Sequence, residues 1–219
     1  AEVRAETVAG RIGMSERTLV DVTGVLIAGG KSLRMGRDKR FLKVNGESVF
    51  ERTLSLLMDT FVETVVVLAE PIESLEVRGC RVVYDVIPNA GSLGGLYTGL
   101  LTASQPRIFA VACDMPFLHA EVIRYMVSCD ETADVVVAEL EGQFQPMHAV
   151  YSKRCAEFLK AMAERQNLKI QTLYRSEALR VAVLGANDLS SLGVGLRSFQ
   201  NINTPEDLAL ADAPISDKP

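Results

Sequence analysis

Basic side chains are concentrated directly after a pair of glycines near the start of the sequence. The segment 25–46 reads VLIAGGKSLRMGRDKRFLKVNG. Glycines at the end of an apolar strand let backbone N–H groups approach a polyphosphate closely. The cations that could neutralise the phosphate charge are Lys31, Arg34, Arg37, Lys39, Arg40 and Lys43. Such a run is also typical of a solvated basic surface, so the segment alone leaves both interpretations open.

The glycine turn does not match the standard nucleotide-binding fingerprints. A Walker loop needs a glycine five residues before the glycine of its G-K-S triplet. The residue at that distance from Gly30 is Val25, and Gly24 misses the position by one. The dinucleotide pattern G-x-G-x-x-G is also missing. A phosphate site here must therefore be of another type.

An acidic residue follows a second apolar run. Asp114 stands in VACDMPFL, where Pro116 prevents the strand from continuing. A carboxylate in this position could hold a hard cation such as Mg²⁺, which prefers oxygen ligands and phosphate partners. Taken alone, Asp114 is better explained as a turn or cap residue. Together with a basic glycine loop on the same side of the fold, the metal interpretation is favoured.

The elements that must position these residues are an alternation of apolar and amphipathic segments. Nearly continuous apolar runs are typical of strands buried on both faces, as in a parallel sheet covered by helices. Strands are predicted at 22–28, 64–69, 80–84, 107–113 and 134–140, and helices within 47–61, 94–104, 120–129, 153–165 and 203–211. Thr204 is the expected N-cap of the last helix, ahead of Pro205. The predicted fold is α/β, a three-layer sandwich with a mostly parallel sheet.

Parallel topology brings the candidate residues to one edge of the sheet. Ligands of open α/β sheets bind beyond the carboxyl ends of the strands. Gly29 and Gly30 follow the first predicted strand, Asp85 follows the third and Asp114 the fourth. We therefore expect these residues to share the same edge.

Composition favours one globular domain. The chain has 219 residues, 48% of them hydrophobic and 23% charged, with a net charge of −5. We expect a flexible extension at 1–21, a domain at 22–212 and a tail at 213–219. The acidic balance argues against nucleic acid or an anionic membrane as partner. No apolar run is long enough to span a membrane. Four widely spaced cysteines fit reduced thiols in a cytoplasmic protein.

Four motifs in order carry a family likeness. LIAGGKSLRMGRDK, GSLGGL, CDMPFL and NINTPEDL together resemble the molybdenum cofactor guanylyltransferases. The resemblance covers about Val22 to Leu210. It implies a Rossmann-like nucleotidyltransferase sheet and a reaction that joins GMP from GTP to the terminal phosphate of molybdopterin or its molybdenum form, with Mg²⁺ as cofactor. Molybdoenzyme chaperones or apo-molybdoenzymes would be further partners.

The resemblance also implies roles for matching residues. Lys39 would contact the phosphates, and Asp114 would bind GTP and the metal ion. Arg34 would act beside them in catalysis and on the molybdopterin side. The remaining nucleotide and acceptor positions are Ile27, Ala28, Gly29, Gly30, Leu68, Asp85, Asn201 and Asn203.

The sequence departs from the family pattern at two places. Leu68 occupies a nucleotide-site position that is often asparagine in the family, so that contact is lost or replaced, with Glu70 as a candidate substitute. Ser92 stands where the family motif has proline. Both changes weaken the nucleotide assignment without removing a catalytic charge.

Two other functions remain open. Cytidylyltransferases acting on the same cofactor tend to carry A-A-G where this chain has Ala28-Gly29-Gly30, so the glycine pair favours guanine. A non-catalytic nucleotide-binding regulatory protein would not need both Lys39 and Asp114. His119 and His148 are interpreted as ordinary helix-start or strand residues, not as a catalytic base.

Overall fold

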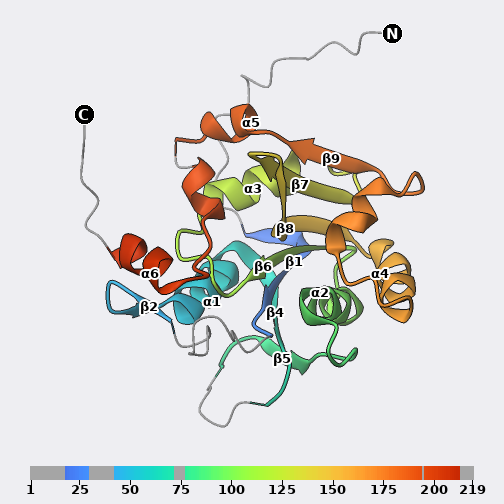
Figure 1. Cartoon of the computed structure of the whole chain (residues 1–219), viewed down its shortest axis with the longest axis horizontal. Helices are drawn as coiled ribbons and strands as arrows, with labels where there is room; N and C mark the ends of the chain where they lie inside the picture. Colours follow the sequence, from blue (N-terminus) through green and yellow to red (C-terminus); the bar gives the residue numbers. More distant parts are fainter. Residues whose placement is uncertain (1–17, 30–41, 72–76, 194, 213–219) are drawn as a thin grey trace.

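A seven-stranded sheet forms the centre of the molecule (Figure 1). The computed structural model describes residues 18–29, 42–71, 77–193 and 195–212. The strand order across the sheet is β5 (Arg81–Tyr84), β4 (Phe61–Leu68), β1 (Leu19–Ile27), β6 (Arg107–Ala112), β8 (Gln143–Ser152), β7 (Val135–Leu140) and β9 (Val181–Leu184). β5, β4, β1 and β6 are parallel, β8 is antiparallel to both its neighbours, and β9 is parallel to β7. The predicted α/β fold with a mostly parallel sheet is confirmed.

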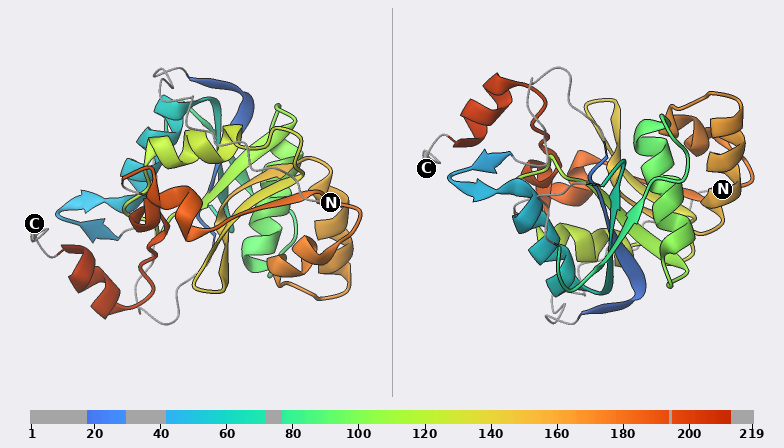
Figure 2. Two further views of the ribbon diagram at one scale, coloured as in Figure 1. Left: turned by 90° about the horizontal axis from the view of Figure 1, so that it is seen from above. Right: turned by 90° about the horizontal axis from the view of Figure 1, so that it is seen from below.

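Helices cover both faces of the sheet and create two separate cores (Figure 2). On one face α1 (Val49–Thr60), α3 (Ala120–Ser128) and the short α5 (Ala186–Ser190) contribute to one buried cluster. On the other face α2 (Gly91–Thr102), α4 (Cys155–Glu164) and the 3₁₀ segment η2 (Ile170–Arg175) contribute to a second. This is the predicted three-layer arrangement.

Glycines let α2 lie unusually close to the sheet. A Cβ atom on Gly95 would stand 2.7 Å from Cγ2 of Ile27, and one on Gly99 would stand 2.7 Å from Cγ1 of Val25. Real Cβ atoms do not approach other carbon atoms this closely, so alanine at either position would force the helix away from β1. These two glycines thus allow α2 to pack closely on β1.

A small hairpin and the last helix form a third cluster beside the main body. β2 (Lys43–Val44) pairs with β3 (Glu47–Ser48), and α6 (Pro205–Asp212) lies next to this hairpin (Figure 1). The buried members are Leu42, Val44, Val49, Ile202 and Ala211. The backbone N–H of Asn45 also donates to the Asp212 carboxylate at 2.5 Å. The end of the predicted domain is therefore attached to the segment that follows the basic run.

The start of α6 shows the predicted cap. Thr204 Oγ1 accepts a hydrogen bond from the N–H of Asp207 at 3.1 Å, and the Asp207 carboxylate accepts one from the N–H of Thr204 at 2.9 Å. The same carboxylate accepts from the N–H of Asn203 at 2.8 Å. This reciprocal capping fixes the chain direction just after Asn203.

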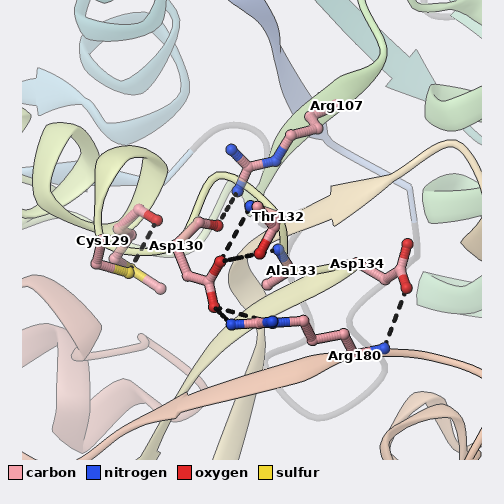
Figure 3. Close-up of polar contacts among 8 residues, drawn as sticks. Arg107, Cys129, Asp130, Thr132, Ala133, Asp134 and Arg180 are labelled. Atoms are coloured by element: carbon pink, nitrogen blue, oxygen red, sulfur yellow. Dashed lines mark hydrogen bonds and ion pairs between the residues drawn. The ribbon is translucent and has the colours of Figure 1, made fainter.

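A polar cluster joins the amino-terminal ends of β7 and β9 (Figure 3). One oxygen of Asp130 accepts from the N–H and hydroxyl of Thr132 and from the N–H of Ala133, at 2.8–3.1 Å. The other oxygen accepts from two nitrogens of Arg180 at 2.9 and 3.2 Å. Burial raises the pKa of Asp130, but these hydrogen bonds and the Arg180 charge outweigh it and hold the pKa below its usual value. Because Asp130 precedes β7 and Arg180 precedes β9, the cluster holds the two strand starts together.

The amino-terminal boundary lies earlier than predicted. β1 begins at Leu19, which pairs with Phe61, so the sheet includes residues assigned in the prediction to a flexible extension ending at 21. The rest of that extension, 1–17, and the predicted tail 213–219 lie outside the described residues. Among the helices that the structure describes, none combines the length and apolar character needed to cross a membrane.

Candidate active site

Backbone hydrogen bonds align the ends of the parallel strands. Ala28 donates to the carbonyl of Val67 at 2.9 Å, and Cys113 donates to the carbonyl of Ile27 at 3.3 Å. On the outer side Asp85 donates to the carbonyl of Leu68 at 2.8 Å. Gly29 is the exposed residue that comes directly after this last rung of β1. Gly29, Asp85 and Asp114 therefore lie along the same carboxyl edge, as predicted.

The ladder also limits how β1 could contact a nucleotide. The Ile27 carbonyl and the Ala28 N–H are both committed to neighbouring strands. The Ile27 side chain is buried against α2. The Ala28 carbonyl, next to the exposed Gly29, is the backbone group of these two residues that lies beyond the last rung of the ladder. The predicted backbone contacts of Ile27 and Ala28 with a nucleotide stay predictions.

Asp114 meets the C-terminal segment at this edge. Its backbone carbonyl accepts a hydrogen bond from the N–H of Ile202 at 2.9 Å. Ile202 is buried in the third cluster, whereas Asn201 and Asn203 on either side of it are exposed. The contact places both predicted acceptor-side residues next to the predicted metal-binding residue, although 88 positions separate Asp114 from Ile202 in the sequence. The contact uses the backbone of Asp114 and not its partly buried carboxylate.

Asp85 is held by the protein itself. Its Oδ1 accepts hydrogen bonds from the Thr98 hydroxyl at 3.1 Å and from the N–H of Ile87 at 3.0 Å. A Cβ atom on Gly94 would stand 2.6 Å from Oδ2, so the carboxylate occupies the space that this glycine leaves open. The arrangement fixes the loop between β5 and α2. A nucleotide contact by Asp85 stays a prediction.

The start of α2 adds positive potential to the same edge. No side chain caps this end, the first turn contains no acidic residue, and Gly91 has a φ of +58° that suits glycine. The first α-helical hydrogen bond runs from the N–H of Gly94 to the carbonyl of Ala90. The N–H groups before it have no partner within the helix, and such groups attract anions. The edge thus suits a phosphorylated ligand.

Most of the basic run lies outside the described residues. This applies to Gly30 and to the predicted phosphate contacts, namely Lys31, Arg34, Arg37, Lys39 and Arg40. Lys43 is described, and its side chain is exposed on β2. It lines an open groove of about 640 Å³ along α1, together with Glu47, Glu51 and Asp59. Lys43 therefore belongs to a surface that includes neither Asp85 nor Asp114.

Leu68 does not belong to the nucleotide site. Its side chain is 3% exposed and packs in the core on the α1 side of the sheet. Including it among the nucleotide-binding residues was wrong for the side chain, because an apolar group buried in the core cannot reach a ligand. Glu70, which follows β4, is exposed, so its predicted replacement role stays a prediction.

Both histidines have structural positions. His119 is the N-cap of α3, where its Nδ1 accepts from the N–H of Glu121 at 3.4 Å. His148 is fully buried in β8, and burial lowers its pKa to about 3 while the Ser198 backbone acts in the opposite direction. The interpretation of one as a helix-start and the other as a strand residue is confirmed. The ring of His148 nonetheless contacts the segment that carries Asn201, a connection the sequence did not reveal.

The fold and the arrangement of its carboxyl edge define an open-sheet α/β protein, a class in which ligands bind beyond the carboxyl ends of the parallel strands. Residues 24–181 match the MobA-like NTP transferase domain. This match covers most of the chain, which therefore belongs to the MobA-like NTP transferase family. The resemblance drawn from the four motifs is confirmed.

Curated relatives match over nearly their whole length. The "Probable molybdenum cofactor guanylyltransferase" of Pelotomaculum thermopropionicum is 36% identical over 194 residues, which cover 88% of this chain and 93% of the relative. The "Molybdenum cofactor guanylyltransferase" of Desulfosudis oleivorans is 33% identical over 196 residues, covering 89% and 96%.

Solved structures agree with this placement. The molybdopterin-guanine dinucleotide biosynthesis protein A of Archaeoglobus fulgidus superposes with a TM-score of 0.76 and 25% identity, over 87% of this chain and 97% of that one. The 2-C-methyl-D-erythritol 4-phosphate cytidylyltransferase of Thermus thermophilus reaches a TM-score of 0.62 at 20% identity, over 87% and 97%. The second likeness shows the shared fold alone.

Proposed function

We propose that the protein transfers GMP from GTP to the terminal phosphate of molybdopterin, or of its molybdenum form, and releases pyrophosphate. The family match and the names of the curated relatives support this function. The observation that carries it is the hydrogen bond from Ile202 to Asp114. This bond brings Asn201 and Asn203, which we assign to the acceptor side, to the same edge of the sheet as Asp114, which we assign to the metal ion.

The proposed chemistry needs positioning more than acid–base catalysis. An oxygen of the acceptor's terminal phosphate, already anionic at neutral pH, attacks the α-phosphorus of GTP. The new P–O bond forms as the bond to the β-phosphate oxygen breaks, and pyrophosphate carries away the electron pair. No covalent enzyme intermediate and no side-chain base is required. This agrees with the structural positions of both histidines.

The two substrates are both strongly anionic, so their repulsion must be offset locally. In this proposal Lys39 stabilises charge on the GTP phosphates as a point charge, and Arg34 acts on the acceptor side. The exposed N–H groups at the start of α2 add to this potential from the described part of the edge. The basic run and this helix end would then act on the same phosphates.

A magnesium ion fits the chemistry of the edge. Mg²⁺ in phosphate-transfer sites is held by one or two carboxylates, substrate phosphates and water. Asp114 would be the protein ligand, and within the described residues no group of three or more His, Cys, Asp and Glu side chains forms a cage of another kind. Bound there, the ion would neutralise phosphate charge.

We also place this activity in the cytoplasm and expect the product to pass to apo-molybdoenzymes or their chaperones. All four cysteines of the chain are free thiols, which suits a reducing compartment.

The test mixes the protein with Mg²⁺, molybdopterin and either GTP or CTP, and follows pyrophosphate release and the mass of the product. A guanine dinucleotide that forms only with GTP supports the proposal. Formation of a cytosine dinucleotide would leave the proposed mechanism intact and show that the transferred nucleotide is CMP and not GMP. No product with either nucleotide, despite GTP binding, would reject the proposal in favour of another acceptor or a regulatory protein.

A further inference from the structure

The segment that carries Asn201 makes four described contacts with the body of the protein. Ser198, in the 3₁₀ segment η3 (Gly195–Phe199), accepts a hydrogen bond through its hydroxyl from the N–H of His119 at 3.1 Å. Ile202 donates to the Asp114 carbonyl at 2.9 Å. Between these two, the Phe199 ring stacks on His148 with a centroid distance of 4.1 Å and an interplanar angle of 23°. Arg197 adds a further contact, because its guanidinium carbon lies 3.9 Å from the centre of the Phe117 ring.

His148 itself belongs to a row of aromatic rings that crosses the sheet. It lies opposite Val111 in the β6–β8 register and meets Phe109 edge-on at 5.3 Å. Phe109 in turn stacks on Phe61 of β4 at 5.9 Å. The row runs from β4 through β6 and β8 and ends at Phe199. The position of η3 is therefore tied to the rigid centre of the sheet.

The imidazole contributes through its flat shape. In the part of the chain that the structure describes, neither ring nitrogen of His148 has a hydrogen-bond partner. Its side chain is completely buried, and the ring is held in the neutral form. The Ser198 backbone lies close enough to act on the ring, but no hydrogen bond of ordinary geometry forms, so the contact that holds η3 here is the stack of the flat ring on Phe199.

We propose that His148 is a positioning residue for the acceptor substrate. It holds η3 in place through Phe199, and so fixes Asn201 and Asn203 beside Asp114. It touches neither substrate. This inference rests on the proposed function, because the acceptor whose binding it controls is molybdopterin.

The test compares His148→Leu, which removes the flat ring, with His148→Phe, which keeps a flat ring and removes the nitrogens. Tyr151→Phe is the matched control. Tyr151 is an equally buried ring of the same strand, but it faces the other core, where its hydroxyl bonds to Tyr174 at 2.7 Å and to the Pro146 carbonyl at 2.8 Å. Phe199→Leu removes the stack from the other side, should His148→Leu fail to fold.

We expect His148→Leu and Phe199→Leu to raise the KM for molybdopterin about tenfold, with kcat and the KM for GTP changed less than about threefold. His148→Phe should restore the wild-type KM, and Tyr151→Phe should not alter it. An unchanged acceptor KM in both leucine variants, or an equal rise in Tyr151→Phe, would overturn the proposal.

Amide hydrogen exchange of the free protein separates this inference from the proposed function. The Ile202 amide should exchange at least about tenfold faster in His148→Leu than in His148→Phe or Tyr151→Phe. Equal exchange in all variants would show that His148 does not hold the segment. If the wild-type protein forms no dinucleotide, the proposed function fails, and the exchange rates still decide whether the stack positions Asn201.

Discussion

Two acids share the carboxyl edge of the sheet but are used differently. Asp85 is bound by Thr98 and Ile87 and fills the space beside Gly94, so it shapes the loop that leads into α2. Asp114 is attached to Ile202 through its backbone carbonyl. Asp85 thus has a structural part in this loop, and Asp114 stays the predicted ligand of a metal ion.

Asp114→Ala is expected to lower kcat by about 10²–10³-fold while the Kd for GTP changes only a few-fold, because charge stabilisation in the transition state exceeds its share in binding. Steady-state kinetics and calorimetric titration with GTP give the two quantities. Asp130→Asn, an acid at the opposite edge, should leave kcat intact. A parallel loss of GTP affinity in Asp114→Ala would instead support a nucleotide-binding role alone.

Substitution by alanine should affect stability differently at two glycines of this edge. At Gly94 a Cβ would stand 2.6 Å from the Asp85 carboxylate, so Gly94→Ala should lower the free energy of unfolding by about 1–3 kcal/mol. At Gly29 a Cβ would meet Ala69 at an ordinary 3.5 Å, so stability should change by less than about 0.5 kcal/mol.

Gly29→Ala is also a test of base selection. Because protein packing does not require glycine there, we expect the clearance to serve the nucleotide, and the ratio of kcat/KM for GTP over CTP should fall. Thermal unfolding and the two-nucleotide assay check both positions. If the Gly29→Ala variant is stable and its preference for GTP over CTP is unchanged, the glycine pair does not determine the choice of guanine.

At the scale of elements, the sequence predicted β1, β4, β5, β6 and β7 and missed β8 and β9. Apolar runs such as 107–113 are buried on both faces and could be recognised as strands. β8 was missed because Pro146 interrupts its pattern. This residue has no N–H to donate, and it lies where the β7–β8 ladder becomes irregular, between Val137 and Glu139.

The same contrast holds for the candidate site. Asp114 and Gly29 were found because they directly follow strands, which makes their position a local property of the sequence. The stack of His148 on Phe199 joins residues 51 positions apart, and the Asp114–Ile202 bond joins residues still farther apart. No local sequence pattern predicts such contacts. The family resemblance indicated Asn201 and Asn203 as site residues but not the contacts that fix their position.

Asp130 is one of two carboxylates at the junction of β7 and β9, where Asp134 accepts a hydrogen bond from the N–H of Arg180 at 3.0 Å. Asp130→Ala should lower the free energy of unfolding by about 1–3 kcal/mol, because the N–H of the buried residue Ala133 and the exposed donors of Thr132 and Arg180 lose this acceptor. Arg180→Ala should cost less than about 1 kcal/mol, since the arginine side chain is 65% exposed and its charge is screened. Urea denaturation measures both. Equal losses would show that the ion pair, not the turn around Thr132, holds the two strands.

For the molecule as a whole, a buried neutral histidine makes stability depend on pH. The pKa of His148 is lowered from 6.5 to about 3 by burial. Between these values the unfolded chain binds a proton that the folded chain does not, so stability falls as the pH falls. This contribution is present in full above pH 6.5 and is lost progressively toward acid.

His148→Phe removes this dependence. Below about pH 6, the free energy of unfolding of the wild type should fall more steeply than that of the variant, by about 1.4 kcal/mol per pH unit. Urea denaturation at intervals down to pH 4.5 measures the difference. The pKa values of Glu63 and Asp130 lie below their usual 4.5 and 3.8. Their contributions to stability are lost as the pH falls below these usual values, and the loss is the same in both proteins. Parallel curves for the two proteins would show that the imidazole can be protonated without leaving the core.

The bond between Asp114 and Ile202 also has a consequence for synthesis on the ribosome. The strands β1, β4, β5 and β6, which carry the nucleotide side of the edge, are complete before residue 114 is added. Ile202 is added 88 residues later, a delay of roughly 4 to 18 s at about 5–20 residues per second. During that interval the nascent chain contains the strands of the carboxyl edge without the segment that carries Asn201 and Asn203. The contact that attaches Asn201 and Asn203 to this edge can form only after Ile202 has been added, so the edge is assembled in two stages during synthesis.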